Sequence, residues 1–107
     1  MQEEKVNKMF WCNVFFSKKD VVVAICDEEL LGKKLKVEGK KLTIEVSEKF
    51  YGGKLVNEEV ALKLLEKATI GNLIGKRCVE LAEKNGFIIK ENVILINGIP
   101  HAQFVKL

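Results

Sequence analysis

The amino-acid sequence predicts an α+β fold: a single domain with a mixed, mostly antiparallel sheet of hairpins and two consecutive helices packed on it. With 107 residues, the chain has room for one hydrophobic core. Runs of β-branched and aromatic residues lie toward both ends, and apolar residues recur at helical spacing between them. We place the domain at residues 9–107 and expect residues 1–8, which lack periodicity, to be flexible.

The first hairpin is expected from two apolar runs. Residues 10–16 (FWCNVFF) are almost continuously apolar, as in a strand covered on both faces, and residues 21–26 (VVVAIC) form a second β-branched run. The polar SKKD sequence between them favours a turn. Asp27 is then expected to cap a short helical turn, and Gly32 to end it in a left-handed conformation.

A second hairpin is expected over residues 35–46, around a turn at Gly39-Lys40. Apolar and polar side chains alternate there, so one face should be basic and exposed to water, with the lysines Lys34, Lys36 and Lys41. Phe50–Gly53 should then form a loop, in which two adjacent glycines permit positive φ and close approach of another group.

Two helices should follow this loop. Asn57 is a favourable N-cap for a helix that ends near Thr69. A second helix is expected from about Gly71 to Asn85, with Gly86 just after its end.

The chain should close with a third hairpin. Residues 93–96 (VILI) and 99–107 flank the dipeptide Asn97-Gly98, which favours a tight hairpin turn. Pro100 implies that the last strand lies at an edge or starts irregularly.

Composition excludes several classes of protein. The three cysteines are odd in number and widely spaced, so we expect reduced thiols, no metal and no cofactor. No apolar run is long enough to span a bilayer, and the first residues differ from a signal peptide, so we expect a cytoplasmic protein without a membrane partner. Enrichment in lysine and glutamate is typical of thermophiles, and equally of AT-rich genomes.

Few residues point to chemistry. His101 and Gln103 should project to one side of the last strand, where they could bind a base edge, a phosphate or a small polar ligand. His101 could also be a general acid or base, or could simply satisfy buried backbone groups. Arg77, the single arginine, could clamp a carboxylate or phosphate, or could pair with a nearby glutamate. Asn72 and Gly75 are expected at the start of the second helix, where free N–H groups could accept an anion.

Charge and motifs leave the partner open. The net charge of +3 is too small to identify a polyanion, and the basic hairpin could bind RNA backbone or simply protect a sheet edge. We find no sign of sequence-specific DNA binding. Phosphate-binding loops and hydrolase nucleophile motifs are absent, which argues against an enzyme, although Cys26 beside Asp27 ends a strand where a nucleophile could lie.

Several motifs together resemble a known family. They are CDEELLGK (26–33), FYGG (50–53), Ala68-Thr69 with residues 72–75, and GIPHAQ (98–103). In this order and spacing they resemble a small archaeal family, domain-of-unknown-function family 424, from about Phe10 to the C-terminus. The resemblance implies an archaeal, cytoplasmic α+β domain and suggests RNA binding, but supplies no catalytic residues.

The leading hypothesis is therefore a non-enzymatic binding domain associated with RNA or translation, with RNA or the ribosome as partner. Its recognition surface would comprise Tyr51, Gly52, Gly53, Asn72, Arg77, His101 and Gln103, aided by Lys34, Lys36 and Lys41. We expect the Tyr51 loop, Asn72 and the His101 strand to approach one another. The alternatives are a small enzyme or ligand-binding protein with a pocket for an anionic metabolite around His101 and Arg77, and a module that dimerises through a sheet edge.

Overall fold

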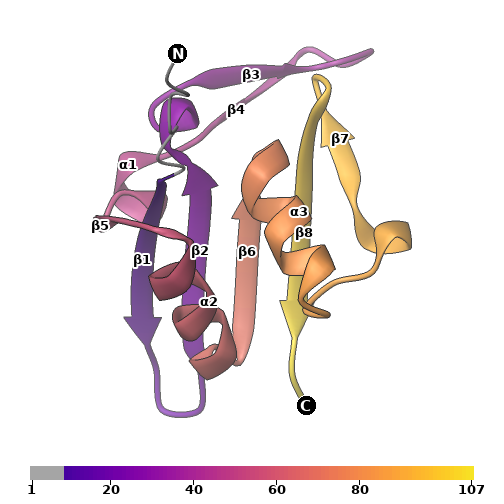
Figure 1. The fold of residues 1–107 in the computed structure, drawn as a ribbon. Coiled ribbons are helices and arrows are strands. Elements are labelled where there is room, and N and C mark those ends of the chain that lie inside the picture. The colour runs from indigo at the N-terminus through magenta and orange to yellow at the C-terminus, as the bar shows by residue number, and fades with distance from the viewer. Residues whose placement is uncertain (1–8) are drawn as a thin grey trace, which may run out of the picture.

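The computed structural model describes residues 9–107, and it confirms the predicted α+β fold (Figure 1). The main sheet has six strands in the order β5-β1-β2-β6-β8-β7. These are β1 (Phe10–Phe16), β2 (Val21–Asp27), β5 (Lys54–Val56), β6 (Ile70–Ile74), β7 (Ile94–Ile96) and β8 (Ile99–Val105). The remaining elements are the hairpin β3 (Lys34–Val37) and β4 (Leu42–Glu45), the helices α1 (Glu48–Tyr51), α2 (Glu58–Lys67) and α3 (Lys76–Lys84), and 3-10 turns at Glu28–Leu30 and Lys90–Asn92. The flexibility expected of residues 1–8 lies outside the described residues.

The three predicted hairpins are confirmed. β1 pairs with β2, β3 with β4, and β7 with β8, all antiparallel. Asn97 and Gly98 both have positive φ, 52° and 79°, as a two-residue hairpin turn requires. The edge position inferred from Pro100 is wrong, because β8 lies between β6 and β7. Pro100 is the second residue of β8 and pairs with Leu95 of β7, so it lies near the start of the strand, as the alternative expected, but the start is not irregular.

The second predicted helix is wrong in its first part, because Gly71–Ile74 belong to strand β6. This strand pairs parallel with β2 and antiparallel with β8. The apolar spacing of a short, buried segment fits a helix and a strand equally well, so spacing alone could not distinguish the two here. Gly71 is needed for packing, because a Cβ there would overlap the ring of Phe104. The two helices are therefore separated by a strand, and α2 is the last element of the long connection from β2 to β6.

The predicted loop at Phe50–Gly53 is partly wrong. Ser47 accepts hydrogen bonds from the N–H groups of Lys49 and Phe50, and this cap starts the short helix α1, in which Tyr51 is only 7% exposed. Neither glycine has a positive φ. The expected close approach does occur, because a Cβ on Gly53 would overlap the carbonyl oxygen of Cys12.

The sheet has a core on each face. The face covered by α2 and α3, here called the helix face, lies in front in Figure 1. Its buried strand residues include Phe10, Cys12, Val23, Ile25, Leu73 and Ala102. On the opposite side, here called the hairpin face, Ala24, Cys26 and Ile74 pack beneath Leu35, Val46 and Tyr51. The β3–β4 hairpin and α1 thus cover the part of this face near the carboxyl ends of β2 and β6. No helix among residues 9–107 is long and apolar enough to cross a membrane.

Candidate functional site

The uncovered part of the hairpin face forms a surface open to solvent. One cross-strand row consists of Phe15, Val22, Ile70 and Val105, and the next row holds Asn72 and Gln103. Phe15 is 37% and Val105 62% exposed, Gln103 is exposed, and the others are half-buried. We call these six residues the open sheet face. It corrects the expectation that β1 is covered on both faces, which holds only for the first half of that strand.

Tyr51, Asn72 and His101 meet beside this face in a polar cluster. The Tyr51 hydroxyl donates a hydrogen bond of 2.6 Å to Asn72 Oδ1, and His101 Nε2 lies 3.3 Å from the same oxygen. Gln103 is the cross-strand neighbour of Asn72. The expected approach of the Tyr51 segment, Asn72 and the His101 strand is confirmed, although Asn72 lies in β6 and not at the start of a helix.

The protonation of the polar cluster follows from burial. Burial raises the pKa of Tyr51, so its hydroxyl keeps its proton and donates. Burial lowers the pKa of His101, so the imidazole is neutral at pH 7. Because an amide oxygen only accepts, Nε2 of His101 carries the proton and Nδ1 is left as an acceptor. Within residues 9–107 the side-chain amide nitrogens of Asn72 and Gln103 donate no hydrogen bond, so they are available to a ligand.

Arg77 lies on the other face, away from the polar cluster. Its guanidinium forms an ion pair with Glu29, donates to the carbonyl oxygen of Met9 and lies 5.3 Å from the centre of the Phe10 ring. The interpretation that Arg77 pairs with a nearby glutamate is therefore confirmed. The predicted pocket around His101 and Arg77 is not formed, because the sheet separates the two side chains.

Asp27 has a role that the sequence did not reveal. It does not cap the turn that follows it. Its buried carboxylate instead accepts hydrogen bonds from the backbone N–H groups of Arg77 (2.9 Å) and Cys78 (2.8 Å) at the start of α3. Burial raises the pKa of this carboxyl, and the two backbone hydrogen bonds oppose that shift. The anion expected at the start of this helix is thus supplied by the protein itself, so no ligand site remains there.

Gly52 and Gly53 serve local packing and do not join the polar cluster. A Cβ on Gly52 would lie 2.6 Å from the carbonyl oxygen of Glu48, and Gly53 packs against β1. Both glycines allow the chain to pass from α1 into β5. Their predicted role in recognition gains no support from this geometry.

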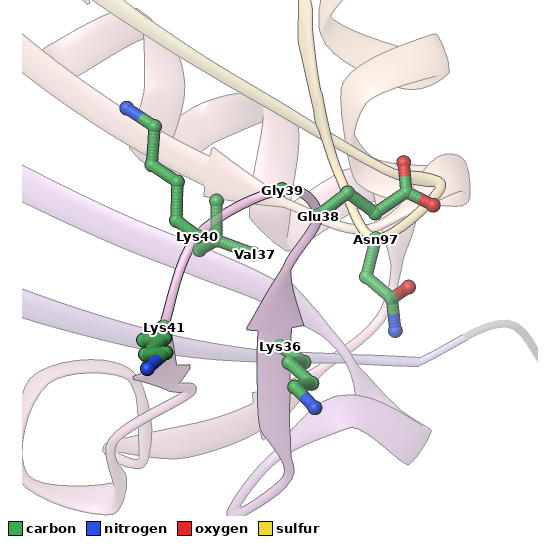
Figure 2. A pocket seen from close by; sticks show the side chains of 7 residues that line it. All are labelled: Lys36, Val37, Glu38, Gly39, Lys40, Lys41 and Asn97. Atoms are coloured by element: carbon green, nitrogen blue, oxygen red, sulfur yellow. The ribbon is translucent and has the colours of Figure 1, made fainter.

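The lysines predicted for the outer face of the β3–β4 hairpin, Lys34, Lys36 and Lys41, are all exposed, although Glu45 lies directly opposite Lys34. Near its tip, an open cavity of about 430 Å³ is lined by the hairpin and by Asn97 of the β7–β8 turn. Figure 2 shows that the side chain of Lys40 extends away from those of Lys36 and Lys41. The lysines do not converge on one point, so this surface can attract a polyanion but is not shaped to hold a single phosphate.

The thiols are unsuited to catalysis. All three cysteines are free and buried, and burial raises the pKa of Cys12 and of Cys26 to about 12. Neither thiol therefore forms a thiolate nucleophile near neutral pH. Among residues 9–107, no group of three or more histidine, cysteine or carboxylate side chains could hold a metal ion.

Similarity to other proteins covers most of the chain. A family model described as "Protein of unknown function (DUF424)" matches residues 15–107, which include the polar cluster. A crystal structure of an uncharacterized conserved protein from Methanopyrus kandleri is similar, with a TM-score of 0.76 and 28% sequence identity. The alignment covers 92% of this chain and 94% of that protein. Among curated proteins, none matches this chain significantly.

Proposed function

The chain belongs to the DUF424 family, whose function is unknown, and we propose from its architecture that it binds single-stranded RNA on the open sheet face. One observation carries the proposal. An exposed row that contains the aromatic ring of Phe15 lies next to a row with Asn72 and Gln103, whose amide nitrogens donate no hydrogen bond within residues 9–107. Sheets that bind single-stranded RNA combine these same two features, since bases stack on exposed rings and their edges bond to polar side chains.

The ring of Phe15 is held in a position that suits stacking. It stacks on Phe50 with ring centroids 5.5 Å apart and an interplanar angle of 13°. Since Phe50 adjoins Tyr51, this ring pair connects the apolar row to the polar cluster. Asn72 lies two strands from Phe15 and His101 three, so different nucleotides of one RNA strand would stack on Phe15 and bond to the amide donors and the His101 Nδ1 acceptor.

Lysines supply long-range attraction. The exposed lysines of the β3–β4 hairpin, Lys34, Lys36 and Lys41, lie on the element that covers the other half of the same sheet face. A strand that extends from the open sheet face toward this hairpin would place its phosphates near them. Affinity should then fall with salt, with a log–log slope of roughly −0.7 for each phosphate neutralised on a single strand.

The test is a titration with labelled RNAs, both single-stranded and structured ribosomal fragments, at two salt concentrations. Replacing the three lysines with glutamine should flatten the salt slope and leave the fold intact. Gln103→Ala removes an exposed amide that forms no hydrogen bond with the rest of residues 9–107, and it should weaken binding about threefold to tenfold. Asn92→Ala, in the exposed 3-10 turn before β7, is the matched control and should bind like the wild type.

Two outcomes would contradict the proposal. Binding that is absent, or insensitive to salt, would exclude an RNA-binding role. If such a protein also formed dimers, self-association through β7 would be favoured, since this edge strand exposes Ile94 and Leu95.

A further inference from the structure

The end of β1 near the β1–β2 turn exposes two consecutive aromatic rings on opposite faces. Phe15 belongs to the open sheet face, whereas Phe16 points to the helix face and is 78% exposed. β5 pairs with β1 only at Phe10, Trp11 and Cys12, so no strand among residues 9–107 extends the sheet beside the second half of β1. A polymer can therefore pass around this edge from one face to the other.

An apolar cavity of about 320 Å³ lies beside Phe16, between β1, β2 and α2. It is lined by Val14, Phe16, Val21, Val23, Leu64 and Lys67. The Lys67 ammonium is the one charged group in this lining. In Figure 1 the end of α2 lies next to the β1–β2 turn, at the end of the molecule opposite the β3–β4 hairpin.

Further lysines surround the mouth of this cavity. Lys18 and Lys19 are exposed in the β1–β2 turn, and like Lys67 they form no ion pair within residues 9–107. The acidic residue of the turn, Asp20, accepts a hydrogen bond of 2.9 Å from the hydroxyl of Thr69. Asp20 keeps its negative charge, but the three lysines outnumber it, so this end of the sheet attracts an anion.

We propose that this cavity binds a nucleobase, with the attached phosphate against Lys67 and the turn lysines. An apolar cavity with a ring at its rim and cations around its mouth fits a ligand that joins a flat apolar body to an anion, as nucleotides do. The inference rests on the proposed function, because the base would belong to the RNA strand that crosses the open sheet face. Phe15 and Phe16 would then contact bases on either side of the sheet edge.

The first test compares variants by RNA titration of the full chain. Phe16→Ala should weaken binding about 5- to 100-fold, because it removes one stacking platform. Lys67→Gln should weaken binding about fivefold near 0.1 M salt and reduce the salt slope by about 0.7. Lys63→Gln, one turn earlier on α2 and outside the cavity lining, and Ile89→Ala, which replaces another exposed apolar side chain, should have no effect.

The second test identifies the source of the nucleotide. The methyl NMR signals of Val14 and Leu64 are followed during addition of uridine, uridine 5′-monophosphate, and an oligouridine of about ten nucleotides. Shifts with the monophosphate and the oligouridine, and weaker shifts with uridine, would support the site. Shifts with the oligouridine alone would support it as a site for RNA only.

The remaining outcomes separate the two proposals. If the monophosphate shifts these signals and no RNA binds, the cavity site stands and the proposed function fails. If RNA binds while Phe16→Ala and Lys67→Gln behave like the wild type, the cavity site is overturned and the proposed function stands. If no nucleotide or RNA binds, both proposals are overturned.

Discussion

The hydrogen bonds to one side-chain oxygen determine which groups of the polar cluster can bind a ligand. One oxygen, Asn72 Oδ1, receives the hydrogen bond of Tyr51 and contacts His101, and this fixes which groups remain free. The Asn72 amide nitrogen is then left as a donor and His101 Nδ1 as an acceptor, and the edge of a base can bond to groups of both kinds. The guanidinium of Arg77, in contrast, is not free to bind a ligand, because it forms an ion pair with Glu29.

The titration of His101 gives a prediction for stability. Its pKa in the folded protein lies below 6.5, because burial disfavours the imidazolium. The unfolded chain therefore binds the proton at higher pH, and the free energy of unfolding decreases as pH falls from 6.5 toward the folded value. His101→Gln lacks this titration. Urea unfolding at about pH 8 and about pH 5 should show a wild-type loss, on acidification, larger than that of the variant; equal losses would contradict it.

The junction of β6 and α3 is the critical point at the element scale. Gly75 turns the chain from strand to helix with a φ of 125°, and Asp27 from β2 caps the helix that follows. The glycine and the carboxylate lie so close that a Cβ on Gly75 would overlap the Asp27 carboxyl group. Because Asp27 is only 2% exposed and bound to two N–H groups, it has no room to move aside.

Two alanine substitutions test this packing. Gly75→Ala should lower the free energy of unfolding by at least about 3 kcal/mol, since it adds a clash to an unfavourable φ. Gly39→Ala is the matched control: its φ is also positive, at 75°, but a Cβ there meets nothing within 4 Å. That variant should lose about 1 kcal/mol. Urea unfolding measures both, and similar losses would show that the contact with Asp27 does not matter.

The two hydrophobic cores of the molecule share the strands of the main sheet. β2 places Val23 and Ile25 in the core beneath the helices, and Ala24 and Cys26 in the core beneath the β3–β4 hairpin. Neither core can lose this strand without exposing the other, so we expect the domain to unfold in one cooperative step.

The three buried cysteines report on this cooperativity. Cys12 and Cys78 lie in the core of the helix face and Cys26 in that of the hairpin face. A thiol reagent in excess should leave all three unmodified under native conditions and modify them at a common rate in increasing urea, because each becomes accessible only on global unfolding. Mass spectrometry of the modified sites would measure this. Earlier modification of Cys26 alone would mean that the β3–β4 hairpin opens independently.

Elements that depend on neighbouring residues could be predicted from the amino-acid sequence. The hairpins follow from alternating side chains and from turn residues such as Asn97-Gly98, and α2 follows from its Asn57 cap and apolar spacing. The recognition of the family was also correct. These predictions succeed because the physical cause of each lies in short motifs. The approach of Tyr51, Asn72 and His101 was also predicted, but it depends on the pairing of β6 with β8.

Features that depend on distant segments of the chain became visible only in the folded structure. Gly71–Ile74 became a strand because β2 and β8 pair with it on both sides. Asp27 caps a helix that begins about 50 residues later in the chain. Phe15 and Phe16 are exposed because β5 pairs only with the first half of β1. Strand pairing, capping at a distance and exposure are set by which segments meet in space, and the local pattern of one chain does not contain that information.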